Sequence, residues 1–272
     1  MQKQQIQLSE YTAGYVDCGS GPTLLFLHGF FGSSANWQAL IEPLSQNYRC
    51  VALDLLGFGD SSKPWLKYNI WHQVDFLTEF IAALGLEDIT LLGHSYGGWT
   101  SAAFAVRYAP SQQPKSLILI APAGIRDDSF VGRYNHLKPL LWESPLVDLG
   151  VALLKPISAL IGQRDFYERI YEVRQALTQQ PVAKSFLVDR LRPEDAIDTV
   201  EKDIHAIQVP TLVVAGVEDS TIPLWHCQAY AERIPKASIV TLTDAEHDLI
   251  QTHVTDITRS IKTLLTPQKC SQ

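Results

Sequence analysis

A serine between two glycines is the clearest candidate for chemistry in this sequence of 272 residues. It is Ser95, in the segment Gly93-His-Ser-Tyr-Gly97, which lies between a short apolar run and a segment with helical periodicity. A G-x-S-x-G pattern between a strand and a helix places the serine on a sharp, strained turn, so its hydroxyl stands clear of the sheet. The glycines are needed because a Cβ atom at either position would strike the neighbouring backbone. The pattern therefore predicts a nucleophilic serine.

A serine hydroxyl is a weak nucleophile unless a base removes its proton and a carboxylate orients that base. Asp219 follows a predicted buried strand, and His247 follows the last predicted strand and precedes the last helix. Two rivals exist for these roles: Glu218 lies one position earlier, and His253 falls inside a helical segment. The order serine, aspartate, histidine is that of one fold's catalytic triad. We therefore predict Ser95 as nucleophile, His247 as base and Asp219 as the acid that orients the base.

Two backbone N–H groups are predicted to form an oxyanion hole. One belongs to Tyr96, directly after the serine and at the start of a helix, where backbone N–H groups point outward. The other belongs to Phe30, in the glycine-flanked loop of residues 28–32. We expect His28 to anchor this loop by hydrogen bonds and His94 to pack beneath the serine turn, neither of them as a metal ligand.

The elements that must position these residues alternate in type along the chain. Short apolar runs predict strands at residues 23–27, 50–53, 89–92, 116–120, 212–215 and 238–242, and residues 5–17 are expected to form an antiparallel hairpin at the sheet edge. Apolar residues at helical spacing run from Ile70 to Leu84 and from Ile250 to Leu264. Such alternation is typical of an α/β fold with a mostly parallel, doubly wound sheet that helices cover on both faces.

The alternation stops between residues 124 and 200, where the chain is helical in character and rich in Leu and Pro. We predict an inserted helical cap at 124–200, and one α/β domain formed by residues 1–123 and 201–272. An apolar stripe in the cap predicts a wall for an apolar substrate, although such a stripe more often serves packing alone. The stripe comprises Leu140, Leu141, Trp142, Leu146, Leu149, Leu153 and Leu154. Phe31, Trp99 and Trp142 are the predicted substrate-binding residues.

The composition excludes several classes of partner. Lys and Arg number 22 against 29 for Asp and Glu, and the net charge of −7 supplies no positive field for nucleic acid or an anionic membrane. Four scattered cysteines form neither a zinc motif nor a disulfide framework, which suits a reducing cytoplasm. The N-terminal residues lack the apolar stretch of a secretory leader, and charges and prolines interrupt the apolar residues 139–162. We therefore expect a cytoplasmic protein without a metal, a cofactor or a transmembrane segment.

These motifs resemble those of the α/β-hydrolase family, in its serine-nucleophile branch of carboxylesterases, lipases and carbon–carbon bond hydrolases. The resemblance spans nearly the whole chain, through residues 28–32, 54–64, 93–98 and 216–219 and through His247. It implies the α/β-hydrolase fold with a cap and a hydrolase that uses a serine. Haloalkane dehalogenases and epoxide hydrolases of the family use an aspartate at the position of Ser95, so the resemblance disfavours those two activities.

Residues near the serine narrow the predicted substrate. The carbon–carbon bond hydrolases carry a Gly-Pro-Gly type of oxyanion loop, which the Phe30-Phe31-Gly32 segment does not match. A related synthase holds its acidic substrate with an arginine where this chain has Trp99. We therefore predict hydrolysis of a carboxylic ester of a small or medium apolar substrate. A carbon–carbon bond hydrolase with the same triad and a small-molecule receptor of this fold are the alternatives, and the oligomeric state and any contact of the cap with lipid stay open.

Overall fold

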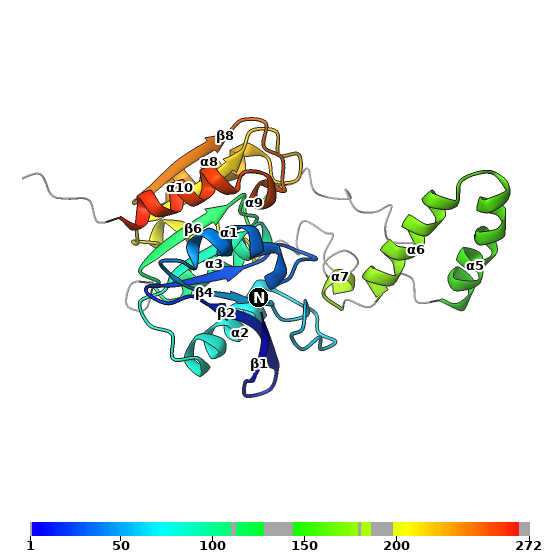
Figure 1. Ribbon diagram of the computed structural model, residues 1–272, viewed down its shortest axis with the longest axis horizontal. Helices are drawn as coiled ribbons and strands as arrows, with labels where there is room; N and C mark the ends of the chain where they lie inside the picture. The colour runs from blue at the N-terminus through cyan, green and yellow to red at the C-terminus, as the bar shows by residue number, and fades with distance from the viewer. Residues whose placement is uncertain (1, 110–112, 128–143, 179–180, 186–197, 267–272) are drawn as a thin grey trace, which may run out of the picture. The chain divides into compact units, whose positions relative to one another are not determined.

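One mixed sheet organises the first of the two units into which the chain folds (Figure 1). The computed structural model describes residues 2–109, 113–127, 144–178, 181–185 and 198–266. The strand order is β1-β2-β4-β3-β5-β6-β7-β8. The strands are β1 (Lys3–Gln7), β2 (Thr12–Cys18), β3 (Thr23–Leu27), β4 (Arg49–Leu53), β5 (Thr90–His94), β6 (Ser116–Ile120), β7 (Thr211–Gly216) and β8 (Ala237–Leu242).

The sheet is parallel from β4 to β8, and the hairpin of β1 and β2 adds an antiparallel edge. Every residue of β5, β6 and β7 is buried, which explains why these strands read as continuous apolar runs in the sequence. The predicted fold class, an α/β fold with a mostly parallel sheet and an edge hairpin, is confirmed. The loops that follow parallel strands gather at one edge, and the loops after β3, β5, β7 and β8 carry the candidate residues.

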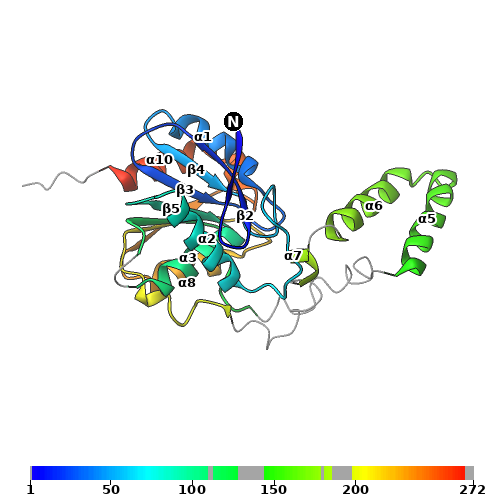
Figure 2. The same ribbon diagram turned by 90° about the horizontal axis from the view of Figure 1, so that it is seen from below.

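Helices cover both faces of this sheet, with α1 and α10 on one face and α2, α3 and α8 on the other (Figure 2). Asn69 begins α2 by accepting a hydrogen bond from the backbone N–H of His72 at 2.9 Å. The predicted C-terminal stripe is divided between two helices, because the chain leaves helical geometry at His253. The helices of this unit are α1 (Gln38–Leu44), α2 (Ile70–Ala83), α3 (Tyr96–Arg107), α8 (Leu224–Arg233), α9 (Leu249–Thr252) and α10 (Val254–Leu265), with single 3-10 turns at Ser34–Trp37 and Ile204–Ala206.

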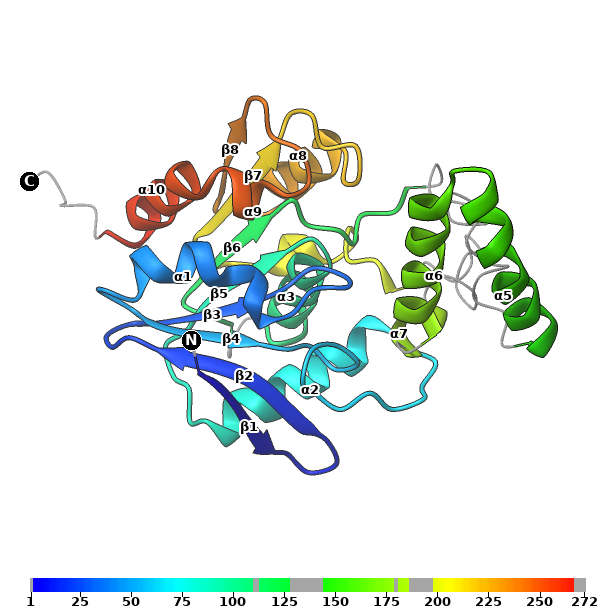
Figure 3. The same ribbon diagram turned by 45° about the vertical axis from the view of Figure 1, so that its right-hand side comes forward.

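The second unit comprises residues 63–68 and 127–197. Its described part holds α5 (Pro145–Leu160), α6 (Arg164–Thr178) and α7 (Pro181–Lys184), and no strand. Helices α5 and α6 pack side by side as a hairpin (Figure 3). The buried side chain of Arg174 on α6 forms an ion pair with the exposed side chain of Asp148 on α5. Leu140, Leu141 and Trp142 lie outside the described residues. The cap boundaries at 124 and 200 stay a prediction. In the described part of the chain, no helix is long and apolar enough to cross a bilayer.

Candidate active site

Ser95 lies on the turn between β5 and α3 with a backbone geometry that L-residues rarely adopt, at φ 54° and ψ −115°. Such a conformation costs about 1–3 kcal/mol and persists only where the surroundings enforce it. Three backbone hydrogen bonds enforce it here: the Ser95 N–H donates to Ile120 O at 2.9 Å, and Ser95 O accepts from the N–H groups of Trp99 and Ala123 at 3.0 Å each. The strained turn is therefore built into the sheet and the helix beside it.

The two glycines of the motif leave no room for a side chain. A Cβ atom on Gly93 would lie 2.2 Å from Gly97 O, and one on Gly97 would lie 2.1 Å from Leu27 O. Both obstacles are backbone atoms, which cannot rotate away as a side chain can. The spacing of the motif is therefore a steric requirement of the close approach between β3, β5 and α3.

The loops after β7 and β8 are joined by their backbones. The Val217 N–H donates to Leu242 O at 3.0 Å, and the Glu218 N–H donates to Ala245 O at 3.1 Å. A Cβ atom on Gly216 would lie 2.3 Å from Ala245 O, so this approach requires glycine as well. The pairing brings the loop of the predicted acid against the loop of the predicted base.

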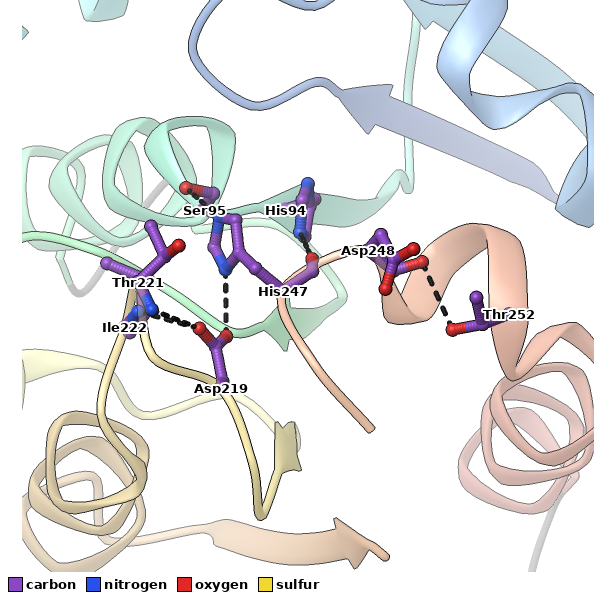
Figure 4. A network of polar contacts seen from close by, with 8 residues as sticks. All are labelled: His94, Ser95, Asp219, Thr221, Ile222, His247, Asp248 and Thr252. Carbon is purple, nitrogen blue, oxygen red and sulfur yellow. Dashed lines mark hydrogen bonds and ion pairs between the residues drawn. The ribbon is translucent and has the colours of Figure 1, made fainter. Parts of the chain in front are cut away.

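Ser95, His247 and Asp219 form one chain of hydrogen bonds (Figure 4). His247 Nδ1 lies 2.8 Å from Asp219 Oδ2, and His247 Nε2 lies 2.9 Å from Ser95 Oγ. Because an ionised carboxylate only accepts hydrogen bonds, Nδ1 carries the proton and Nε2 of a neutral ring accepts from the serine hydroxyl. The structure thus brings the three predicted residues together in the order aspartate, histidine, serine.

The Asp219 side chain is only 1% exposed, yet its environment favours the charged form. Burial raises the pKa of the carboxyl. The hydrogen bond and charge of His247 and the amides of Thr221 and Ile222 lower this pKa by more than burial raises it, so the pKa lies below its usual value. Both amides donate to Asp219 Oδ1 at 2.8 Å. The rival Glu218 is exposed, whereas the rival His253 contacts the Thr252 hydroxyl at 2.9 Å.

The loop after β3 lies directly against the serine turn. A Cβ atom on Gly29 would be 3.3 Å from Ser95 Cβ, so the backbone of this loop runs past the nucleophile. Phe30 follows immediately, and its ring centroid lies 5.6 Å from that of Tyr96, the first residue of α3. The two residues predicted to supply the oxyanion hole thus flank Ser95, one on each of two neighbouring elements.

His28 and Asp54 hold this loop from beneath. His28 Nε2 accepts from the Leu55 N–H at 3.0 Å while Nδ1 donates to Gly29 O at 2.7 Å, and burial lowers the pKa of His28. Asp54 Oδ1 accepts from the Ser34 N–H at 2.5 Å. The neutral His28 ring is therefore the anchor that the sequence led us to expect, and the buried carboxylate of Asp54 fixes the far end of the same loop.

His94 makes a contact that no sequence pattern indicated. Its ring lies 4.8 Å from that of His247, and Nε2 lies 2.9 Å from His247 O, across 153 positions in the chain (Figure 4). Burial, followed by the neighbouring His247, lowers the pKa of His94 to about 3. The ring is therefore neutral near pH 7, and its Nε2–H donates to the backbone of the predicted base.

The predicted substrate-binding residues differ in their surroundings. Phe31 is 47% exposed and has a left-handed backbone, at φ 60°. Trp99 is half-buried in α3, and its Nε1–H donates to Asp198 O at 3.3 Å. Trp142 lies outside the described residues. Within the described ranges, no group of His, Cys, Asp and Glu side chains has the arrangement of a metal site.

Fold and site together define the class of protein. Residues 22–254 match the family model of the alpha/beta hydrolase fold. The strand order, the strained serine between two glycines, and the acid and histidine after the last two strands agree with that match. The chain belongs to the α/β-hydrolase family.

The proteins to which this chain is similar carry names that describe different activities. The dihydrolipoyllysine-residue acetyltransferase component of an acetoin cleaving system from Cupriavidus necator is 30% identical over 84% of this chain, which spans only 59% of that protein. The 2-hydroxy-6-oxo-6-(2'-aminophenyl)hexa-2,4-dienoic acid hydrolase of Metapseudomonas resinovorans is 27% identical over 77% of this chain and 72% of the relative. Among solved structures, a bacterial membrane phospholipase A is similar with a TM-score of 0.75 and 25% identity, over 97% of this chain and 85% of that one.

Proposed function

We propose that this chain is a serine hydrolase that cleaves a carboxylic ester of a small or medium apolar substrate through an acyl-enzyme. The observation that carries the proposal is the unbroken chain of contacts from Asp219 through His247 to Ser95, at 2.8 and 2.9 Å. A histidine that is oriented by a buried carboxylate and bonded to a strained serine is suited to moving one proton on and off that serine. The chemistry requires no cofactor.

In the acylation half, His247 Nε2 takes the proton of Ser95 Oγ as the oxygen attacks the ester carbonyl carbon. The carbonyl π electrons move to its oxygen, and the Phe30 and Tyr96 N–H groups stabilise the resulting oxyanion. When the tetrahedral intermediate collapses, the carbon–alkoxy bond breaks and His247 gives its proton to the leaving alcohol. Asp219 stays ionised throughout and stabilises the imidazolium that forms twice in each cycle.

In the deacylation half, His247 removes a proton from a water molecule, whose oxygen attacks the acyl carbon. The bond from the acyl carbon to Ser95 Oγ then breaks, and His247 returns the proton to the serine. The products are one carboxylic acid and one alcohol for each ester and water consumed, and the protein ends as it began.

Two features favour an apolar ester over an acidic substrate. Trp99 occupies the helix position at which an arginine would hold a carboxylate, and Phe31 is exposed in the loop that runs past the serine. A phospholipase A is among the similar structures. The second candidate is carbon–carbon bond hydrolysis with the same triad, which the hydrolase of M. resinovorans among the relatives favours. A receptor that binds without turnover is the third.

Labelling with a fluorophosphonate probe, followed by hydrolysis of p-nitrophenyl acetate, butyrate, octanoate and laurate, tests the proposal. The wild type and the control Ser260→Ala are expected to label and to turn over many times, because Ser260 lies on α10 and hydrogen-bonds Asp256 O. Ser95→Ala is expected to do neither. Folded wild-type protein that fails to label would exclude a nucleophilic Ser95. Labelling with about one turnover would favour a receptor. Labelling without ester hydrolysis, but with cleavage of a vinylogous ketone acid in a parallel assay, would favour the carbon–carbon bond hydrolase.

A further inference from the structure

The ring of His94 is enclosed by three segments that come from distant parts of the chain. Its own strand, β5, holds it next to Ser95. The loop after β3 passes over it, where a Cβ atom on Gly29 would lie 3.1 Å from His94 Nδ1. The loop after β8 lies on its other side, with His247 O 2.9 Å from Nε2. His94 therefore lies close to the loop after β3 and is hydrogen-bonded to the backbone of the loop after β8, two of the loops that the proposed reaction uses.

The hydrogen bond to His247 has one possible direction. A backbone carbonyl oxygen only accepts, so His94 Nε2 must carry the proton and Nδ1 of the neutral ring is left without one. Nδ1 faces the crowded side at Gly29, where the absence of a Cβ makes room for the ring. The bond links the side chain beside the nucleophile to the main chain of the proposed base (Figure 4).

The neutral charge state of His94 suits a hydrogen-bond donor that lies next to His247. The titratable groups that influence it are His247 after β8, Asp219 after β7 and His28 after β3. Burial and His247 outweigh the carboxylate, so the pKa is lowered to about 3 and the ring stays neutral. His247 becomes a cation twice in the proposed cycle, and a second cation with its ring centroid 4.8 Å away would oppose that step. His94 supplies a donor without adding that charge.

We propose that His94 is a positioning residue, which holds the His247 backbone so that Nε2 stays at Ser95 Oγ while His247 changes charge. The inference rests on the proposed function and adds to it a residue outside the triad. An alternative is that His94 only fills space beneath the turn. The two differ in kinetics, because a space-filling ring does not need an N–H donor, whereas a misplacement of the base of about 1 Å costs about 100-fold in rate.

Three variants separate these accounts. His94→Phe keeps an aromatic ring and removes the donor, and we expect kcat for p-nitrophenyl butyrate to fall about 10- to 100-fold at nearly constant KM. His94→Gln places an amide N–H close to the position of Nε2 and is expected to recover kcat to within about threefold of the wild type. His205→Phe alters an exposed histidine of the same unit and is expected to change neither constant.

Equal kcat in wild type and His94→Phe would overturn the positioning role, and so would losses of equal size in the Phe and Gln variants. Should His94→Phe not fold, NMR of the imidazole nitrogens in the wild type decides. A neutral Nε2–H tautomer that does not titrate between pH 5 and 8 supports the proposal, and an imidazolium there overturns it. An active Ser95→Ala would instead remove the proposed function itself, whatever the His94 variants do.

Discussion

The loops at the carboxyl edge of the sheet and the hairpin of α5 and α6 are built in opposite ways. In the loops, buried polar side chains contact specific partners, as Asp219 does with His247 and two backbone amides. In the hairpin, large apolar side chains of α5 are exposed at helical spacing: Leu146, Leu149, Leu153, Leu154, Ile157 and Leu160. Specific hydrogen bonds between individual atoms define the structure of the loops, whereas a repeating pattern of apolar side chains characterises the hairpin.

This difference leads us to expect that mutations in the two regions have effects of very different size. Removing one partner from a buried polar chain leaves the other partner misoriented or unpaired, which is costly. Removing one exposed leucine from a stripe leaves its neighbours in place, and surface changes seldom alter the free energy of unfolding by more than about 0.5 kcal/mol. Three predictions test the contrast, in order of decreasing effect.

Asp219→Asn is expected to lower kcat about 10³- to 10⁴-fold. The amide keeps the shape of the carboxylate, but it lacks the charge that stabilises the imidazolium and it permits the wrong histidine tautomer. Steady-state kinetics on p-nitrophenyl butyrate and the rate of fluorophosphonate labelling measure the effect.

Glu218→Gln is the matched control for that prediction. It removes a carboxylate one position earlier in the same loop, where the side chain is exposed, and we expect kcat to stay within about twofold of the wild type. If Glu218→Gln were the damaging change and Asp219→Asn harmless, the assignment of the acid would be reversed.

Acid is expected to destabilise the folded chain through the buried histidines. The pKa of His94 is lowered to about 3 and that of His28 is also lowered, while a histidine in the unfolded chain titrates near 6.5. Between those values the unfolded chain binds the proton and the folded chain does not, so stability falls as the pH falls below about 6.5. His94 alone should remove about 2 kcal/mol from the free energy of unfolding between pH 7 and 5. The lowered pKa of Asp219 adds a loss only below its ordinary value of 3.8.

Urea unfolding at pH 7, 6 and 5 measures this dependence. His94→Gln should show a smaller fall than the wild type, because it no longer contributes a buried group that titrates. His205→Gln changes an exposed histidine and should follow the wild type. An unchanged slope in His94→Gln would mean that His94 binds its proton equally in the folded and the unfolded chain, so that folding does not lower its pKa.

The contrast also explains how far the sequence could be interpreted. The strands were predictable because strands buried on both faces are short apolar runs, and Ser95 was predictable because the steric needs of Gly93 and Gly97 leave a mark at fixed spacing. Asp219 and His247 followed from their positions after strands. These are local signals, and each needs only a few neighbouring residues to be visible.

Contacts between distant segments produce no such local pattern in the sequence. The bond from His94 to His247 O spans 153 positions, and the Tyr68 N–H donates to Ser185 Oγ across 117 positions at 2.7 Å, which helps to place residues 63–68 in the second unit. The interruption at His253 depends on one residue's backbone angles, while the apolar stripe continues through it in the sequence. Periodicity shows which face of a segment is apolar, and it does not show where the backbone turns.

Leu153→Ser, on the second unit, is expected to have the smallest effect and the most selective one. Leu153 is 58% exposed, so we expect no measurable change in the free energy of unfolding. If the apolar stripe binds an acyl group, kcat/KM should fall about 3- to 10-fold for p-nitrophenyl octanoate and laurate and stay constant for acetate, because only a long chain has methylenes to lose contact. Ile239→Ser, which removes an exposed apolar residue from β8, is the control and should change no chain-length preference. An equal loss for all four esters would show that Leu153 affects the reaction itself and not the binding of the acyl chain. No loss for any ester would show that Leu153 does not bind the acyl chain.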